Sequence, residues 1–479
     1  MLRLLRHIAK TSFDTNIPPI MAEKAKFDLT QGKVSFHVLR MLGPFAIAVI
    51  ALISTGIVDT IYLGRLSDPD RPNIGVWALA ALGFAYPLTF LGNSANIGLG
   101  AGTMSAVSRA FGQGDSERAR RHGAAAILMA VTVMLGLVSL MLLVMPNVLP
   151  MMGASGEILH MAQSYLAISL PGLVVISVAT TCNNILRAGG EAALPSSIMI
   201  FGAVVNIILD PFLIYGWGPF PRLEVQGAAI ATLSGNICAA LFGFYIAFFH
   251  RKIISFANMT FGSIQRAWAI IGRVGIPAAI TNIVVPLAAA IAVTIIARNL
   301  DTIEVAAFTV AGRAELISVG VLYALSACIG AITGQNGGAG KTERVRETFK
   351  FCFWICVVWS TVMAVVLAIF APQIAGLFST DDAVVAATLP YFYIVPITIF
   401  GYGFVFVSAA GFNALGRPSY GLIYTIIRSL ILYVAFIYIG VHYDGLRGAF
   451  FGIAAANVIS GIIACGWSLL KVPMTAKES

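Results

Sequence analysis

Apolar stretches of about 20 residues or more recur along the whole chain, separated by short polar segments. A helix of this length crosses about 30 Å of hydrocarbon at 1.5 Å per residue. The stretches are long and continuous, whereas the strands of a transmembrane barrel would be short and alternating. The pattern therefore predicts an all-α polytopic membrane protein with twelve transmembrane helices, at residues 42-64, 75-100, 122-145, 158-182, 194-216, 226-249, 274-297, 305-333, 351-371, 389-412, 420-440 and 447-470.

The composition supports a membrane location. Hydrophobic residues make up 58% of the chain and charged residues only 11%, against roughly half and a quarter in ordinary soluble domains. So few charges would not cover the surface of a soluble protein of 479 residues. The 47 glycines agree with helices that pack closely in lipid through small side chains.

The basic residues are distributed unevenly between alternate loops. Of the 30 Lys and Arg residues, 23 lie at the N-terminus, in alternate loops or at the C-terminus, and the intervening loops hold five: Arg65, Arg71, Arg222, Arg298 and Arg447. The positive-inside rule then predicts that both termini are cytoplasmic. The net charge of +9 reflects topology, and we expect no nucleic-acid partner. Because no organelle address is recognisable, we expect the cell (inner) membrane.

The two halves of the chain resemble each other at a shift of about 226 residues. The segment Gly112–Arg118 falls near Gly337–Arg344, and Gly227–Asn236 resembles Gly448–Asn457 at a slightly smaller shift. Since six helices return the chain to the same side, the halves are expected to form two six-helix lobes related by a pseudo-two-fold axis along the membrane normal. The predicted division is a cytoplasmic tail at 1-40, an N-lobe at 41-250, a cytoplasmic linker at 251-273, a C-lobe at 274-471 and a cytoplasmic tail at 472-479.

Polar side chains gather at one predicted depth of the N-lobe. Asp59 in the first helix and Asp210 in the fifth lie about five or six residues from the outer ends, roughly 8 Å below the hydrocarbon boundary. Thr232 of the sixth helix reaches a similar depth, and Asn206 lies one turn from Asp210 on the same face. Their oxygens suit an alkali cation such as sodium at Asp59, Asn206 and Asp210, and a carboxylate removed from water would equally well accept a proton.

A structural explanation for these residues stays open. Asp210 could cap a helix interrupted before Pro211, and Asp59 could mark a helix end near water. Pro44 and Pro211 each remove a donor from the helix ladder, so both helices are expected to bend. Bending at Pro44 could open or close a cavity as Asp59 changes its protonation.

The predicted C-lobe carries fewer intramembrane charges. Arg313 and Glu315 lie in the eighth helix and Arg428 in the eleventh, where they could form a structural pairing or line a cavity. The Gly-rich segment 334-340 lacks the spacing of a phosphate-binding loop, and the six His residues have no metal-ligand spacing. We therefore expect no enzyme activity and no cofactor, and an ion gradient, of H+ or Na+, as the energy source.

Several motifs taken together resemble the multidrug and toxic compound extrusion (MATE) family. They are the run from Arg187 through Asp210 and Pro211 to Thr232, the segment Val58–Gly64, the tripeptide Gly334–Asn336 and the tetrapeptide Leu415–Pro418. The resemblance extends over essentially the whole chain after residue 35. It implies two lobes around a central cavity, a coupling site at the positions of Asp59, Asn206, Asp210 and Thr232, and a helix-bending proline at Pro44.

The resemblance also implies a function. We expect a secondary active antiporter that exports small organic, typically cationic, compounds in exchange for protons or sodium ions, and that functions as a monomer in the lipid bilayer. Some members use acids in the seventh and tenth helices; this chain has none there, which favours coupling through the N-lobe. The alternatives are a flippase for lipids or lipid-linked precursors of the same superfamily and, from another class, a channel or membrane scaffold.

Overall fold

The structure, a computed structural model, describes residues 28–257, 259–378 and 381–475, and these residues form helices and no strands. The helices of the first half are α2 (Val34–Gly64), α3 (Ile74–Gly112), α4 (Ser116–Met151), α5 (Gly156–Ala188), α6 (Ala193–Tyr215) and α7 (Glu224–Tyr245), which η1 (Ile246–His250) extends. Those of the second half are α8 (Phe261–Asn299), α9 (Thr302–Gly338), α10 (Thr342–Ile369), α11 (Ala371–Phe378), α12 (Asp382–Ile394), η2 (Pro396–Thr398), α13 (Ile399–Ala414), α14 (Pro418–Ile426), η3 (Ile427–Tyr433) and α15 (Val434–Thr475).

The described residues supply twelve membrane crossings, although only 11 helical stretches are long and apolar enough to span. The last stretch, Pro418–Lys471, has 54 residues, which at 1.5 Å per residue is about 80 Å and far exceeds one bilayer. It turns back at Asp444 and Gly445, and Gly445 has the left-handed φ of 54° that favours glycine. Close backbone approaches of Gly440 to Gly448 and of Gly452 to Phe436 show that the two arms are antiparallel neighbours. The predicted twelve-helix fold is confirmed.

Several helices are longer than the predicted spans because they continue beyond the hydrocarbon at the end that carries the basic loops. The helix α3 continues to Gly112, and α8 begins at Phe261, inside the segment predicted to link the lobes. Hydropathy indicates where a span leaves the hydrocarbon, whereas a helix ends where the backbone conformation changes. Here α3 and α9 end just before Gly114 and Gly340, which have φ of 78° and 70°.

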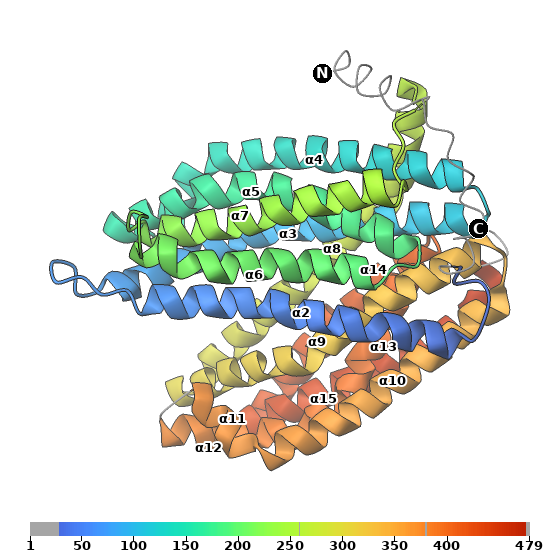
Figure 1. Ribbon diagram of the computed structural model, residues 1–479. Coiled ribbons are helices and arrows are strands. Elements are labelled where there is room, and N and C mark those ends of the chain that lie inside the picture. The colour runs from blue at the N-terminus through green and yellow to red at the C-terminus, as the bar shows by residue number, and fades with distance from the viewer. Residues whose placement is uncertain (1–27, 258, 379–380, 476–479) are drawn as a thin grey trace.

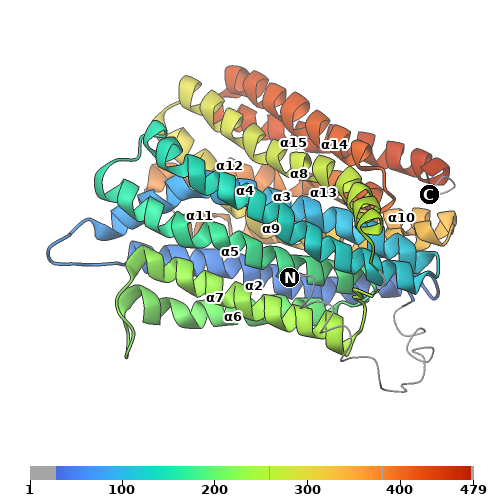
Figure 2. The ribbon, with the colours of Figure 1, turned by 90° about the horizontal axis from the view of Figure 1, so that it is seen from above.

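The helices form two lobes, α2–α7 and α8–α15 (Figure 1). Figure 1 shows the lobes together at the end that carries the first residues of α2 and diverging toward the other end. Helix α3 of the first lobe packs along α8 and α9 of the second, and α8 lies beside α14 and α15 (Figure 2).

Small residues and backbone groups bring the lobes together where they meet. A side chain at Gly112 would meet the Gln335 carbonyl, and one at Gly338 would meet the Arg109 carbonyl. The Ser105 hydroxyl donates to the Ala414 carbonyl over 3.1 Å. These contacts bring the backbones of the two lobes directly together at their crossing.

The segment before α2 also reaches the second lobe, which the expected N-terminal tail did not anticipate. Leu29 is fully buried; its N–H donates to the Gln335 side chain over 3.0 Å and its carbonyl accepts from the Asn336 amide over 3.1 Å. Arg344 donates to the Gly32 carbonyl over 2.7 Å. Since Gln335 also donates to the Ala188 carbonyl of α5 over 2.7 Å, residues 28–33 form a strap across both lobes. The rest of the predicted tail, residues 1–27, lies outside the described residues.

Candidate functional site

The structure brings together the four predicted polar residues of the N-lobe. The Asn206 amide lies 3.4 Å from the Asp210 carboxylate on the same turn of α6 and donates to the Thr232 hydroxyl of α7 over 3.2 Å. Asp59 of α2 lies close to all three side chains. The four side chains, Asp59, Asn206, Asp210 and Thr232, are called the N-lobe cluster below.

Close helix packing places these side chains. Gly235 of α7 sits directly against the Gly202 carbonyl of α6, and Gly227 sits against the Leu213 carbonyl. Because neither glycine carries a side chain, the two backbones approach closely enough for Asn206 to reach Thr232. Helix α2 is continuous through Pro44 and packs against α6, which brings Asp59 to the same place.

The N-lobe cluster holds buried oxygens that lack a hydrogen-bond donor. Asp210 is 0% exposed and Asn206 is 4% exposed. One oxygen each of Asp59, Asn206 and Asp210 is buried without a partner among the described residues. Burying such a group unpaired costs about 1–3 kcal/mol or more, so the arrangement fits an additional proton or a hard cation. The described residues contain no group of three His, Cys, Asp or Glu side chains that would suit a transition metal.

Tyr165 of α5 is a member of this environment that the sequence did not single out. It lies within electrostatic range of both Asp59 and Asp210 and packs among the buried residues of the first lobe. Nothing in its local sequence distinguishes it from the other 13 of the 14 tyrosines. Its position follows only from how α5 packs against its neighbours.

Charges outside the spans connect the ends of the same helices. Arg71, between α2 and α3, bonds to Glu224 over 2.5 Å and to Asp68 over 2.8 Å. The pKa of Arg71 is raised, mainly by the bond to Glu224, and the pKa of Asp68 is lowered, mainly by its bond from Arg71. Because Glu224 begins α7, this ionic group ties the loop after α2 to the helix that carries Thr232.

The three intramembrane charged residues of the second lobe differ in how deeply they are buried. Arg313 is exposed, whereas Arg428 is buried and Glu315 half-buried. The Arg428 guanidinium donates to Asn457 over 3.0 Å and to Ser429 over 3.3 Å. Glu315 and Arg428 line one cavity, and the described residues contain no salt bridge between them.

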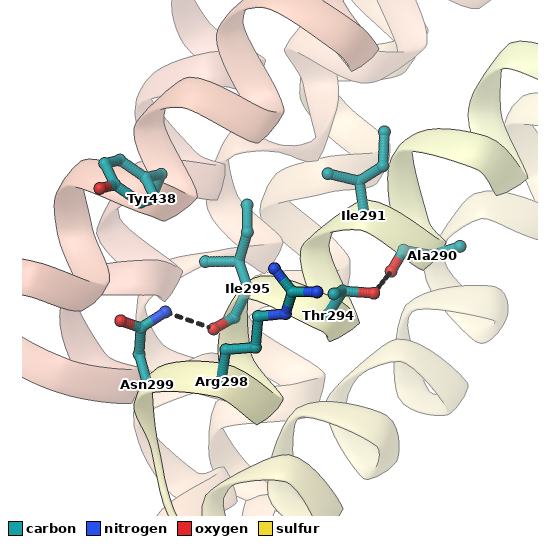
Figure 3. A pocket seen from close by; sticks show the side chains of 7 residues that line it. All are labelled: Ala290, Ile291, Thr294, Ile295, Arg298, Asn299 and Tyr438. Carbon is teal, nitrogen blue, oxygen red and sulfur yellow. Dashed lines mark hydrogen bonds between the residues drawn. The ribbon is translucent and has the colours of Figure 1, made fainter.

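Another cavity, of about 370 Å³, lies near the far end of α8 and is lined by Ala290, Ile291, Thr294, Ile295, Arg298, Asn299 and Tyr438 (Figure 3). Two of its polar side chains form hydrogen bonds within α8 itself. The Thr294 hydroxyl donates to the Ala290 carbonyl over 2.9 Å, and the Asn299 amide donates to the Ile295 carbonyl over 2.8 Å. These two side chains are therefore engaged by the backbone of α8.

The fold and the N-lobe cluster define a class of protein. Two duplicated six-helix lobes, in contact at one end, with buried carboxylates inside one lobe, are the construction of a membrane transporter. These features place the chain in the class of proteins that move small molecules across a membrane.

Comparison with known proteins identifies the family. The MatE family model matches twice, over residues 44–212 and 277–439, once in each half of the chain. The chain belongs to the MATE family, as its sequence motifs indicated.

Individual relatives extend over nearly the whole chain. An FAD transporter from Shewanella oneidensis is 30% identical over 442 residues, covering 92% of this chain and 96% of the relative. The multidrug export protein MepA of Staphylococcus aureus is 25% identical, covering 88% and 90%. A solved outward-facing conformation of a multidrug resistance MATE transporter is 26% identical with a TM-score of 0.87, covering 95% and 99%.

Proposed function

We propose that this protein is a secondary active antiporter that exports small organic compounds, typically cationic, in exchange for protons or sodium ions. The observation that carries the proposal is the N-lobe cluster, in which three buried oxygens lack donors. A proton shared between Asp59 and Asp210 would supply one donor. A sodium ion would use the same oxygens as ligands, and no separate site is required for the two ions.

The geometry of the lobes supports alternating access. They are in contact at the end that carries the basic loops and diverge at the other (Figure 1). If the basic end is cytoplasmic, as the charge asymmetry predicts, the described conformation is open to the outside. The coupling ion then enters the N-lobe cluster from outside. Release of the ion accompanies opening of the crossing between α3 and α9.

The test is efflux of a fluorescent organic cation from liposomes that contain the purified protein, under a proton gradient and a sodium gradient applied separately. We expect Asp59→Asn to abolish gradient-driven efflux while the protein remains folded. The matched control is Asp70→Asn, because Asp70 is an exposed acid in the loop after α2. Normal coupled efflux by well-folded Asp59→Asn protein would refute the proposed coupling site.

A second candidate substrate class is flavin nucleotides. The observation that favours it is the 30% identity to an FAD transporter across 92% of this chain, higher than that to the multidrug export protein MepA, at 25%. The same liposomes loaded with FAD decide between the two classes. Export of FAD without export of organic cations would show that the substrates are flavin nucleotides and not cationic drugs. A lipid flippase would move neither.

A further inference from the structure

A cavity of about 290 Å³ in the second lobe has the features of a ligand site that is separate from the N-lobe cluster. It lies among α8, α9, α12, α13, η3 and α15. Its walls are largely aromatic and aliphatic, with Phe308, Tyr391, Tyr402, Tyr433 and Phe450 contributing rings. A volume of this size is at the lower end for small-molecule pockets, so it suits one ring system better than a whole dinucleotide.

Arg428 is the central polar group of this cavity. It is 4% exposed, and its guanidinium lies over the Tyr402 ring at 3.4 Å from the centroid. Two of its nitrogens donate to Asn457 and Ser429, but its Nε is buried without a partner. Arg428 belongs to the π-helical turn η3, an irregularity that is frequent at functional sites.

Two other side chains of the cavity carry polar groups for which no hydrogen-bond partner is found among the described residues. The Tyr391 side chain is 1% exposed, and its hydroxyl is buried without a hydrogen-bond partner. Glu315 lines the same cavity from α9, and no hydrogen bond or ion pair of its carboxylate is found among the described residues. The cavity thus offers donors from Arg428 and Tyr391 and an acceptor from Glu315.

The chemistry of these groups defines the ligand. One positive and one negative side chain cancel, so the cavity has no net charge that would attract an ion. Stacked aromatic walls favour a flat ring. A carboxylate accepts an N–H, whereas a guanidinium Nε and a phenol donate to carbonyl oxygens. This combination matches a ring edge in which an N–H lies between or beside carbonyl groups, as in an imide.

We propose that this cavity binds a planar, uncharged heteroaromatic ring with an imide edge, of which the flavin ring is an example. The proposal rests on the proposed export function and specifies which part of a substrate the second lobe recognises. Glu315 accepts the imide N–H, Arg428 and Tyr391 donate to its carbonyl oxygens, and the remaining aromatic side chains of the walls pack against the ring face. Any charged or flexible remainder of the substrate lies outside the cavity.

Lumiflavin, which is the flavin ring without its side chain, is a direct probe. We expect purified full-length protein to quench lumiflavin fluorescence saturably. Tyr391→Phe should weaken binding about ten-fold because it removes one buried hydrogen bond. Glu315→Gln should weaken binding by a similar factor because it replaces a charge-assisted hydrogen bond by a weaker neutral one. Both substitutions preserve size, so folding is expected to be maintained. Arg313→Gln is the matched control, since Arg313 lies two residues from Glu315 but is exposed.

A methylated probe tests the imide edge itself. Lumiflavin methylated on its imide nitrogen lacks the N–H and should bind about ten-fold more weakly to the unaltered protein, with little further loss in Glu315→Gln. Equal binding of the two probes, or equal binding by the Tyr391→Phe, Glu315→Gln and control proteins, would overturn the proposal. Displacement of lumiflavin by tetraphenylphosphonium in a way that depends on Glu315 would also overturn it, because the cavity would then be a cation site.

The efflux and lumiflavin-binding measurements together distinguish failure of the proposed export function from failure of the proposed cavity. Lumiflavin binding that depends on Glu315 and Tyr391, in a protein that exports nothing under either gradient, would support this cavity and reject the export function. Efflux of organic cations that is unaffected by Glu315→Gln, without lumiflavin binding, would reject the cavity and keep the export function.

Discussion

Two glycines at the crossing of α3 and α9 hold the lobes in contact, and enlarging either one should shift the protein toward the conformation in which this end is open. An added Cβ at Gly112 would lie 2.0 Å from the Gln335 carbonyl oxygen, and one at Gly338 would lie 2.3 Å from the Arg109 carbonyl oxygen. Both obstacles are backbone atoms, which cannot rotate away. The substitution Gly112→Ala can therefore be accommodated only if α3 and α9 move apart.

The size of the effect follows from the cost of overpacking. Forcing one methyl group into a close-packed contact costs about 1–3 kcal/mol. This steric cost is absent from the conformation in which α3 and α9 have separated. The equilibrium between the two conformations should therefore shift by about 5- to 150-fold toward the separated state. Alanine is also a better helix former than glycine, so α3 itself is not weakened by the change.

Spin labels on the two lobes measure the shift directly. Glu117 in α4 and Glu343 in α10 are both exposed at the same end of the molecule, and the distance between labels at these positions reports the separation of the lobes. Gly330→Ala is the matched control on α9, because the nearest atom to an added Cβ there is a Met104 side-chain carbon at an ordinary 3.6 Å. An unchanged distance distribution in folded Gly112→Ala protein would refute the idea that this crossing holds the end closed.

Three further predictions concern the strap, the N-lobe cluster and the loop between α2 and α3. Leu29→Ala should destabilise the protein by about 2–5 kcal/mol in a denaturation experiment because Leu29 is fully buried, whereas Leu39→Ala, at a residue 56% exposed, should have little effect. Asp210→Asn and Asn206→Ala should impair ion-dependent efflux more than substrate binding; the reverse result would place them in the substrate cavity. Asp68→Asn should lower the melting temperature slightly near pH 5, and this difference should disappear once the pH has fallen below the lowered pKa of Asp68. The lowered pKa of Asp68 stabilises the fold above its ordinary value of about 3.9, and this stabilisation is lost as the pH falls through the lowered value.

The fold was predictable because lipid imposes one requirement on every span. Each crossing must satisfy its own backbone hydrogen bonds, so length and hydropathy are sufficient to find it. Hydropathy says nothing about a helix outside the hydrocarbon, which is why the extensions of α3 and α8 were not predicted. The docking of Leu29 was also unpredictable, since one apolar residue in a polar tail carries no pattern.

The candidate site was predictable to the extent that it depends on helical geometry. The four-residue spacing of Asn206 and Asp210 and the similar depths of Asp59 and Thr232 required only the rise of a helix. Tyr165 required knowledge of how α5 packs, which the sequence does not contain. For Glu315 and Arg428 the sequence left a pairing and a cavity as alternatives, and the structure places both side chains on one cavity without a salt bridge between them.

The duplicated backbone explains how two lobes with different chemistry can move together. Gly114 and Gly340 share a left-handed backbone, as do Gly190 and Gly416, and each pair is separated by the same 226 positions. The contacts of Gly112 with Gln335 and of Gly338 with Arg109 are mates under the same shift, so α3 and α9 cross on the pseudo-two-fold axis. Turns and crossing points have thus kept their symmetry, whereas the polar side chains have not. Under the two proposals, an ion loaded beside Asp59 and a ring held beside Arg428 act on one symmetric crossing, and each ligand changes the free energy of opening it from its own side.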